Sequence, residues 1–97
     1  MNLQVSFKHM ESSDALREYV EEKASKFKKY FDGKVHVTWT VGKEHGEFTS
    51  HCHLLGNHID FFGEGSATDA FASVDLAIDK IDRKLKKHKE VVTNHKS

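Results

Sequence analysis

Apolar and polar residues alternate in four short segments of the chain, which is the pattern of strands with one buried face. These segments cover residues 2–8, 34–41, 47–55 and 58–62. The second, KVHVTWTV, is the clearest, because valines and a tryptophan occupy one side and histidine and threonines the other. The pattern therefore predicts four half-buried strands.

Polar turn signals separate the last three of these strands. The segment GKEHG, residues 42–46, predicts a turn between the second and third strands. Gly56-Asn57 fits a tight two-residue turn before the fourth strand, and residues 63–68 are expected to end the sheet. Such short connections predict an antiparallel meander.

The first helical segment has apolar residues at steps of three and four. It is expected to begin at an N-cap supplied by Ser12 or Ser13 and to stop at Gly33. Acidic residues come early in this segment and lysines late, the order that the helix macrodipole favours. Part of its charge pattern is therefore explained by helix stability alone.

The second helical segment is expected to begin between Ser66 and Asp69. Ser66 or Thr68 can cap it, and Asp69 suits its first turn. The chain contains no proline, so the helix is expected to run to about Glu90, with residues 91–97 as a frayed tail.

The element order is thus β-α-β-β-β-α. A helix between the first two strands makes their pairing parallel if they are adjacent, with a right-handed crossover. Two amphipathic helices suffice to cover one face of a four-stranded sheet. We predict an α+β fold, a two-layer sandwich with both helices on one face, formed by residues 1–97 as a single domain.

Composition agrees with one folded domain, since 37% of the 97 residues are hydrophobic and 31% are charged. No segment resembles a signal peptide or a membrane span, which predicts a cytoplasmic protein without membrane contact. Cys52 is the only cysteine, so no intrachain disulfide is expected.

The formal net charge is zero, yet bases cluster in DKIDRKLKKHKE, residues 79–90. At about 100° per residue, four of them share one stripe of the helix that points away from its apolar side. We call Lys80, Arg83, Lys84 and Lys87 the basic stripe. Asp75, Asp79 and Asp82 fall on one flank, where they are expected to support the helix without neutralising the centre of the stripe.

The basic stripe has two interpretations. Charge runs on helices are usually solvated faces, and lysines near a helix C-terminus complement the dipole. A row of bases that spans two turns can also follow a phosphate backbone, with little base specificity. The wheel geometry leaves both open.

Two motifs carry a resemblance to a known family. They are DALREYVEEKASKFKKYFD, residues 14–32, and TDAFASVDLAIDKIDRKLKKHK, residues 68–89. Over nearly its whole length the chain resembles the short ribosome hibernation promoting factor family, which includes ribosome-associated inhibitors. The resemblance implies a fold similar to double-stranded RNA-binding domains. It also implies binding to the small ribosomal subunit near the decoding centre, which blocks messenger and transfer RNA sites and inhibits translation in stationary phase or stress.

The resemblance also implies which residues contact 16S ribosomal RNA. Matched by position, these are Lys80, Arg83, Lys87, Lys26 and Lys29. Expected placement beside them adds Lys84, Lys86, Lys28 and Arg17. The chain departs from the usual motif in reading Asp69-Ala70-Phe71, without the tyrosine hydroxyl. It looks like the short form, for which ribosome modulation factor and paired ribosomes are candidate partners.

Other chemistry has weaker support. Strand alternation turns Cys52 away from His51 and His53, so the three cannot bind one metal ion without a bulge. Cys52 is expected to be a buried hydrophobe, and no enzyme, metal, cofactor or small-molecule substrate is predicted. Two alternatives remain, a stand-alone double-stranded RNA-binding module and a His-bearing metal-binding domain.

Overall fold

The computed structural model describes residues 1–30, 34–56 and 58–94, with side chains up to residue 89. The strands are β1 (Asn2–Lys8), β2 (His36–Glu44), β3 (Glu47–Gly56) and β4 (Ile59–Ala67). The helices are α1 (Asp14–Ala24), the 3-10 helix η1 (Ser25–Tyr30) and α2 (Ala70–Asn94). The predicted element order is confirmed.

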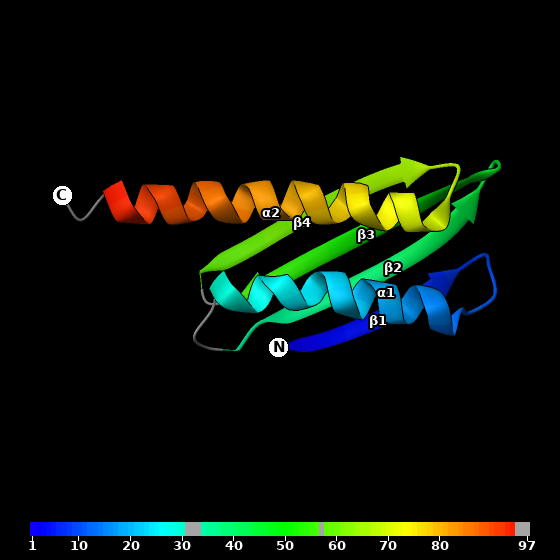
Figure 1. Cartoon of the computed structure of the whole chain (residues 1–97), viewed down its shortest axis with the longest axis horizontal. Coiled ribbons are helices and arrows are strands. Elements are labelled where there is room, and N and C mark those ends of the chain that lie inside the picture. The colour runs from blue at the N-terminus through cyan, green and yellow to red at the C-terminus, as the bar shows by residue number, and fades with distance from the viewer. Residues whose placement is uncertain (31–33, 57, 95–97) are drawn as a thin grey trace.

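The sheet has the order β1-β2-β3-β4, with β1 and β2 parallel and the other neighbours antiparallel. Both helices lie on the same face of this sheet (Figure 1). The predicted α+β sandwich of two layers is therefore confirmed. The second face of the sheet is covered by none of the described elements.

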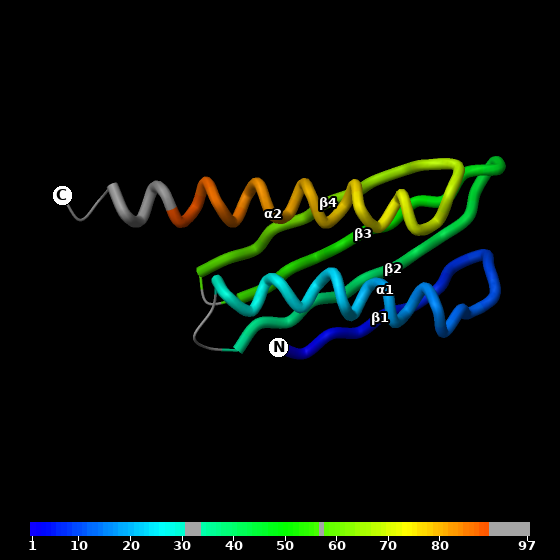
Figure 2. Tube along the Cα trace, viewed as in Figure 1, coloured from blue at the N-terminus to red at the C-terminus, as the bar shows by residue number. Residues whose placement is uncertain are grey.

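The two helices run in the same direction, as the trace in Figure 2 shows. The reason lies in the topology, because β1 and β4 point the same way and each is followed by a helix that runs back across the sheet. Consequently η1 and the second half of α2 lie at the same end of the molecule, where α2 extends past the sheet.

The core lies between the sheet and the helices. Alternate strand residues supply its floor, including the fully buried Trp39, Cys52 and Leu54. The helices contribute residues such as Phe27 and Ile81, also fully buried. The apolar residues that recur every second position in the strands and every three or four positions in the helices thus form one hydrophobic cluster.

Helix α2 lies unusually close to β4, because two glycines of that strand face it. A Cβ atom at Gly63 would lie 2.9 Å from the carbonyl oxygen of Ala77. A Cβ atom at Gly65 would lie 2.7 Å from the carbonyl oxygen of Ser73. Such distances are too short for any residue but glycine, so these positions set the depth at which α2 packs.

The first helical segment is capped as predicted, but it changes type. The Ser13 hydroxyl accepts a hydrogen bond of 3.2 Å from the Leu16 amide. The α-helix ends at Ala24 and continues as the 3-10 helix η1, so the expectation of one uninterrupted α-helix is wrong. The predicted stop at Gly33 lies outside the described residues.

Both predicted turns were placed too early. Residues 42–44 belong to β2, and Glu44 pairs with Glu47, so that only His45 and Gly46 connect the strands. These two have φ angles of 52° and 78°, the left-handed values that a tight hairpin turn of type I′ requires. Gly56 is the last residue of β3 and pairs with Ile59, while Asn57 lies outside the described residues.

The start of α2 also differs from the prediction. Strand β4 continues to Ala67, so residues 63–67 extend the sheet rather than end it. The cap is Asp69, whose carboxylate accepts a hydrogen bond of 3.2 Å from the Phe71 amide, and not Ser66 or Thr68. The helix continues to Asn94, past the expected end, and the frayed tail stays a prediction.

Candidate nucleic-acid interface

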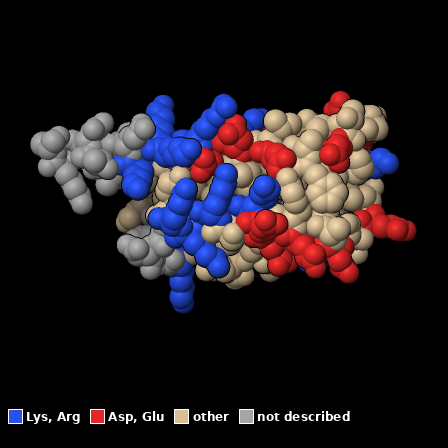
Figure 3. Space-filling view, in the orientation of Figure 1, with Lys and Arg blue, Asp and Glu red and all other residues tan. Residues whose placement is uncertain are grey.

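Lys and Arg side chains gather at one end of the helical face, while Asp and Glu gather toward the other (Figure 3). The basic end is formed by η1 and by the second half of α2, which the parallel course of the helices brings together. Cations at the C-terminal ends of helices are also favoured by the macrodipole. Charge is therefore separated along the helical layer although the chain as a whole is neutral.

Lys80 and Lys87 form the outward part of the basic stripe. Both are exposed, whereas Ile81 and Leu85 from the same turns are buried. Among the described residues, neither lysine forms a hydrogen bond or an ion pair. Their charges remain available to an anionic partner.

Arg83 is also exposed, but its guanidinium pairs with Asp79 at 3.0 Å. Asp79 thus pairs with the basic residue at the edge of the stripe, and not with Lys80 or Lys87 at its centre. The pair is largely in solvent, so it is weak and an anion can compete for the arginine.

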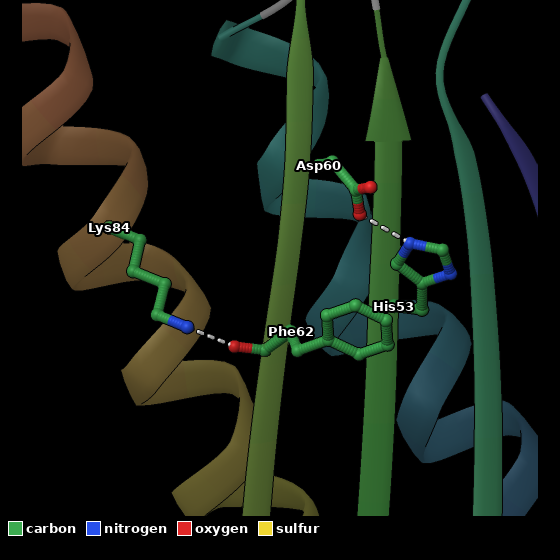
Figure 4. Close-up of polar contacts among 4 residues, drawn as sticks. All are labelled: His53, Asp60, Phe62 and Lys84. Atoms are coloured by element: carbon green, nitrogen blue, oxygen red, sulfur yellow. Dashed lines mark hydrogen bonds and ion pairs between the residues drawn. The ribbon is translucent and has the colours of Figure 1, made fainter.

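Lys84 lies at the side of α2 that faces the edge strand β4. Its ammonium donates a hydrogen bond to the carbonyl oxygen of Phe62 (Figure 4). This contact satisfies an acceptor on the free edge of the sheet. Lys84 therefore belongs to the basic stripe by position while making a contact that supports the fold.

Asp82 connects the two helices beneath the basic end. It is buried, accepts a hydrogen bond of 3.2 Å from the Tyr30 hydroxyl, and pairs with Lys86 at 3.1 Å. Burial by itself raises the pKa of Asp82, but the hydrogen bond from Lys86 and the charge of Lys26 outweigh burial and lower it. Asp82 is thus a charged anchor that holds Lys86 and not an exposed flank residue.

The lysines of η1 point in different directions. Lys26 lies on the side of α2, near enough to lower the pKa of Asp82. The Lys29 ammonium sits 5.3 Å from the centre of the Tyr30 ring. Lys28 lines a shallow hollow with Met1 and Leu3, on the side of β1. All three are exposed, but Lys28 flanks the basic end rather than facing α2.

Arg17 does not lie beside the other predicted residues, and that placement was wrong. It stands in the first turns of α1, far along the helix from η1. Its guanidinium donates a hydrogen bond of 3.0 Å to the Val5 carbonyl oxygen and lies 5.4 Å from the centre of the Phe7 ring. These contacts tie α1 to β1 and occupy the side chain.

The two tyrosines have a role that the sequence pattern did not reveal. Both are half-buried and donate hydrogen bonds to acids of α2. Tyr19 bonds Asp75 at 2.6 Å, which raises the pKa of its hydroxyl to about 12, and Tyr30 bonds Asp82. The sequence offered one sign of these bonds, an aspartate of α2 for each tyrosine, namely Asp75 and Asp82.

Two histidines of the sheet are paired with carboxylates. His51 lies 3.3 Å from Glu64, and His53 lies 2.6 Å from Asp60. Within residues 1–30, 34–56 and 58–94, no three His, Cys, Asp or Glu side chains converge as metal ligands. Cys52 is buried, and burial raises the pKa of its thiol to about 12. No helix in the described part of the chain has the length and apolarity of a membrane span.

The amino-acid sequence assigns the chain to a known class of protein. The sequence model of the family described as Sigma 54 modulation protein / S30EA ribosomal protein matches residues 3–93. The chain therefore belongs to that family, and the resemblance seen in its two helical motifs is confirmed.

Individual relatives carry a more specific name. The ribosome hibernation promoting factor of Azotobacter vinelandii is 37% identical over 92 residues, which cover 93% of this chain and 84% of that protein. The ribosome hibernation promoting factor of Escherichia coli strain K12 is 35% identical over 97 residues, which cover 98% and 100%. The chain is thus similar to these factors over almost their whole length.

Solved structures show the same fold. The N-terminal domain of Thermus thermophilus Protein Y superposes with a TM-score of 0.82 at 24% identity, covering 91% of this chain and 99% of that one. A ribosomal subunit interface protein from Coxiella burnetii gives a TM-score of 0.81 at 18% identity, covering 93% and 99%. At these identities the likeness supports the architecture.

Proposed function

We propose that this protein is a ribosome hibernation factor. It binds 16S ribosomal RNA of the small subunit near the decoding centre and inhibits translation in stationary phase or stress. Family membership and the names of its relatives support the association with ribosomes. The observation that carries the proposal is the basic end, where exposed bases of η1 and α2 gather on one side of a neutral chain.

A rigid cationic end suits a folded RNA. Each lysine or arginine that neutralises a phosphate releases a counterion from the RNA. This release adds affinity that does not depend on the nucleotide sequence. The two helices are held together by one core and by the Tyr30–Asp82 hydrogen bond. The backbone positions that carry their lysines and arginines are therefore fixed before binding. Little ordering entropy is then lost on binding.

The proposed mechanism is occupancy without catalysis. A folded body with principal extents of 49 × 21 × 17 Å would exclude messenger and transfer RNA from the channel that it fills. The protein would act in the cytoplasm. Cooperation with ribosome modulation factor and formation of paired ribosomes remain predictions about its partners.

The test is co-sedimentation of the full chain with purified small subunits. The variant Lys80→Glu/Lys87→Glu reverses the charge of the two lysines of the stripe that form no hydrogen bond or ion pair with the described residues. We expect its affinity to fall by at least about tenfold, with a shallower dependence on salt. The thermal midpoint should stay near that of the wild type, because both side chains face solvent.

The matched control is Lys8→Glu/Lys43→Glu. It changes the net charge equally but alters β1 and β2, away from the basic end. Equal losses of affinity in the two variants would contradict a localised RNA interface. Preference for an equal mass of duplex RNA over the subunit would instead favour the double-stranded RNA-binding module.

A further inference from the structure

The open face of the sheet differs in charge from the basic end. Its outward residues alternate with the buried ones along each strand. Among the described strand residues on this face, four carboxylates stand against one lysine: Glu44, Glu47, Asp60, Glu64 and Lys8. Glu44 and Glu47 even pair directly across the hairpin, where like charges destabilise a sheet. A cationic partner would relieve this repulsion.

Phe62 stands on this face, about midway along the edge strand β4. Its residue is 62% exposed, the largest value among the big hydrophobic residues that the structure describes. Its ring stacks on the His53 imidazole, with centroids 4.1 Å apart and planes only 2° from parallel. The Asp60 carboxylate holds the edge of that imidazole through its Nε2 atom at 2.6 Å, as Figure 4 shows. The aromatic ring is therefore held in one orientation while remaining in water.

The second face of the Phe62 ring is available for stacking. His53 stacks on one face of the ring, and because the residue is 62% exposed the opposite ring face remains accessible. Glu64, two residues further along β4, points to the same side of the sheet and is itself exposed. A flat cation placed on the ring would then have a carboxylate beside it.

We propose that this site, consisting of Phe62, His53, Asp60 and Glu64, binds an arginine side chain of a protein partner. A guanidinium stacks on an aromatic ring through its plane and can also pair with a carboxylate, whereas an ammonium does so less well. The surrounding carboxylates favour a basic polypeptide and repel the phosphates of RNA. The Phe62 side chain lies on the open face of the sheet, and only its backbone carbonyl oxygen contacts the basic stripe, through Lys84. The proposal does not depend on the proposed function.

The test is titration of the full chain with a short oligo-arginine peptide, followed by amide chemical shifts. We expect the shifts to centre on β3 and β4 around His53 and Phe62. The variant Phe62→Ala should weaken the peptide affinity by about fivefold, and Phe62→Leu should do nearly the same because it keeps bulk but loses the ring. An oligo-lysine peptide of equal length should bind more weakly.

Two controls separate this site from the other charged surfaces. Leu76→Ala removes another exposed apolar side chain, from the helical layer, and should leave peptide binding unchanged. Lys80→Glu/Lys87→Glu should retain peptide binding even if it loses the small subunit. Equal affinity of Phe62→Ala and the wild type, or shifts confined to the acids of α1, would overturn the proposal. Shifts around Phe62 with oligouridine but not with the peptide would also overturn it, in favour of base stacking.

Discussion

In residues 70–81 of α2, small and apolar side chains pack against β4, whereas in residues 82–89 exposed bases outnumber buried side chains. The first half is anchored by contact with Gly63 and Gly65 and by a buried hydrogen bond of 2.9 Å between Ser73 and Ser50. The second half still contacts β4 through Lys84 and His88, but it holds most of the basic stripe. One helix thus combines an anchor and an electrostatic surface.

The difference between the halves teaches that stability and binding are separable along this helix. Substitutions in the first half change packing, which is sensitive to single methyl groups. Substitutions of exposed bases in the second half change the field outside the protein and leave the core intact. Variants in each half should therefore lose different properties.

The largest effect is expected from Gly65→Ala in the anchored half. The new Cβ would lie 2.7 Å from the Ser73 carbonyl oxygen and 2.8 Å from the Ala77 backbone nitrogen, so α2 has to move. We expect a loss of about 3 kcal/mol of unfolding free energy. In a domain of this size that loss lowers the thermal midpoint by roughly 15 °C, which calorimetry would detect.

Gly42→Ala is the matched control for this change. Its new Cβ would meet the Lys8 carbonyl oxygen at 3.4 Å, an ordinary contact, so little stability should be lost. If the two variants unfolded at the same temperature, the close approach of α2 to β4 would not be what limits stability. Small-subunit binding by Gly65→Ala, measured well below its midpoint, should persist.

The regular parts of this fold follow from sequence periodicity, and the turns do not. Alternation identified all four strands, because a strand with one buried face must alternate. The β3–β4 hairpin shows the limit. A turn at Gly56-Asn57 would have placed His53 opposite Asp60, whereas the observed register places it opposite Phe62. The displaced turn hid the stacked pair, since alternation fixes a residue's face but not its partner.

Periodicity also predicted which helix residues of the candidate site face outward, but not the contacts that they make with other elements. The wheel correctly turned Lys80 and Lys87 outward, because their apolar neighbours face the core. It could not predict that Arg17 reaches the Val5 carbonyl oxygen, a contact between elements distant in sequence. Nor could it show that Asp82 is buried, because its cost of burial is met by Lys86 and by Tyr30 of another helix.

A smaller effect is expected from Asp82→Asn, at the junction of the two halves. The change removes the charged partner of Lys86 while keeping an acceptor for the Tyr30 hydroxyl. We expect a loss of about 1 kcal/mol at neutral pH, measured by urea unfolding. Subunit binding should not weaken, because the change removes a negative charge from beneath the basic end.

The same variant should also alter the dependence of stability on pH. The folded protein lowers the pKa of Asp82 below its unfolded value, so this carboxylate stabilises the fold above the unfolded pKa. That contribution is lost as the pH falls through the folded pKa. The stability difference between the wild type and Asp82→Asn should therefore shrink in acid, and a difference that is constant or grows there would contradict the assignment.

The smallest effect is expected from Asp79→Asn, which tests whether the exposed half acts through its field. Asp79 pairs with Arg83 at 3.0 Å in a largely solvated contact, so its loss should cost little stability. Freed from this partner, Arg83 should raise the affinity for the small subunit by about two- to threefold at low salt, fading as salt increases. Glu18→Gln, an equal charge change on α1, is the control and should leave affinity unchanged, because it is distant from the basic end. A weaker affinity for Asp79→Asn would mean that the ion pair orients Arg83 for binding. Residues 82–89 would then not act through their charge alone, which would contradict the distinction between the two halves of α2.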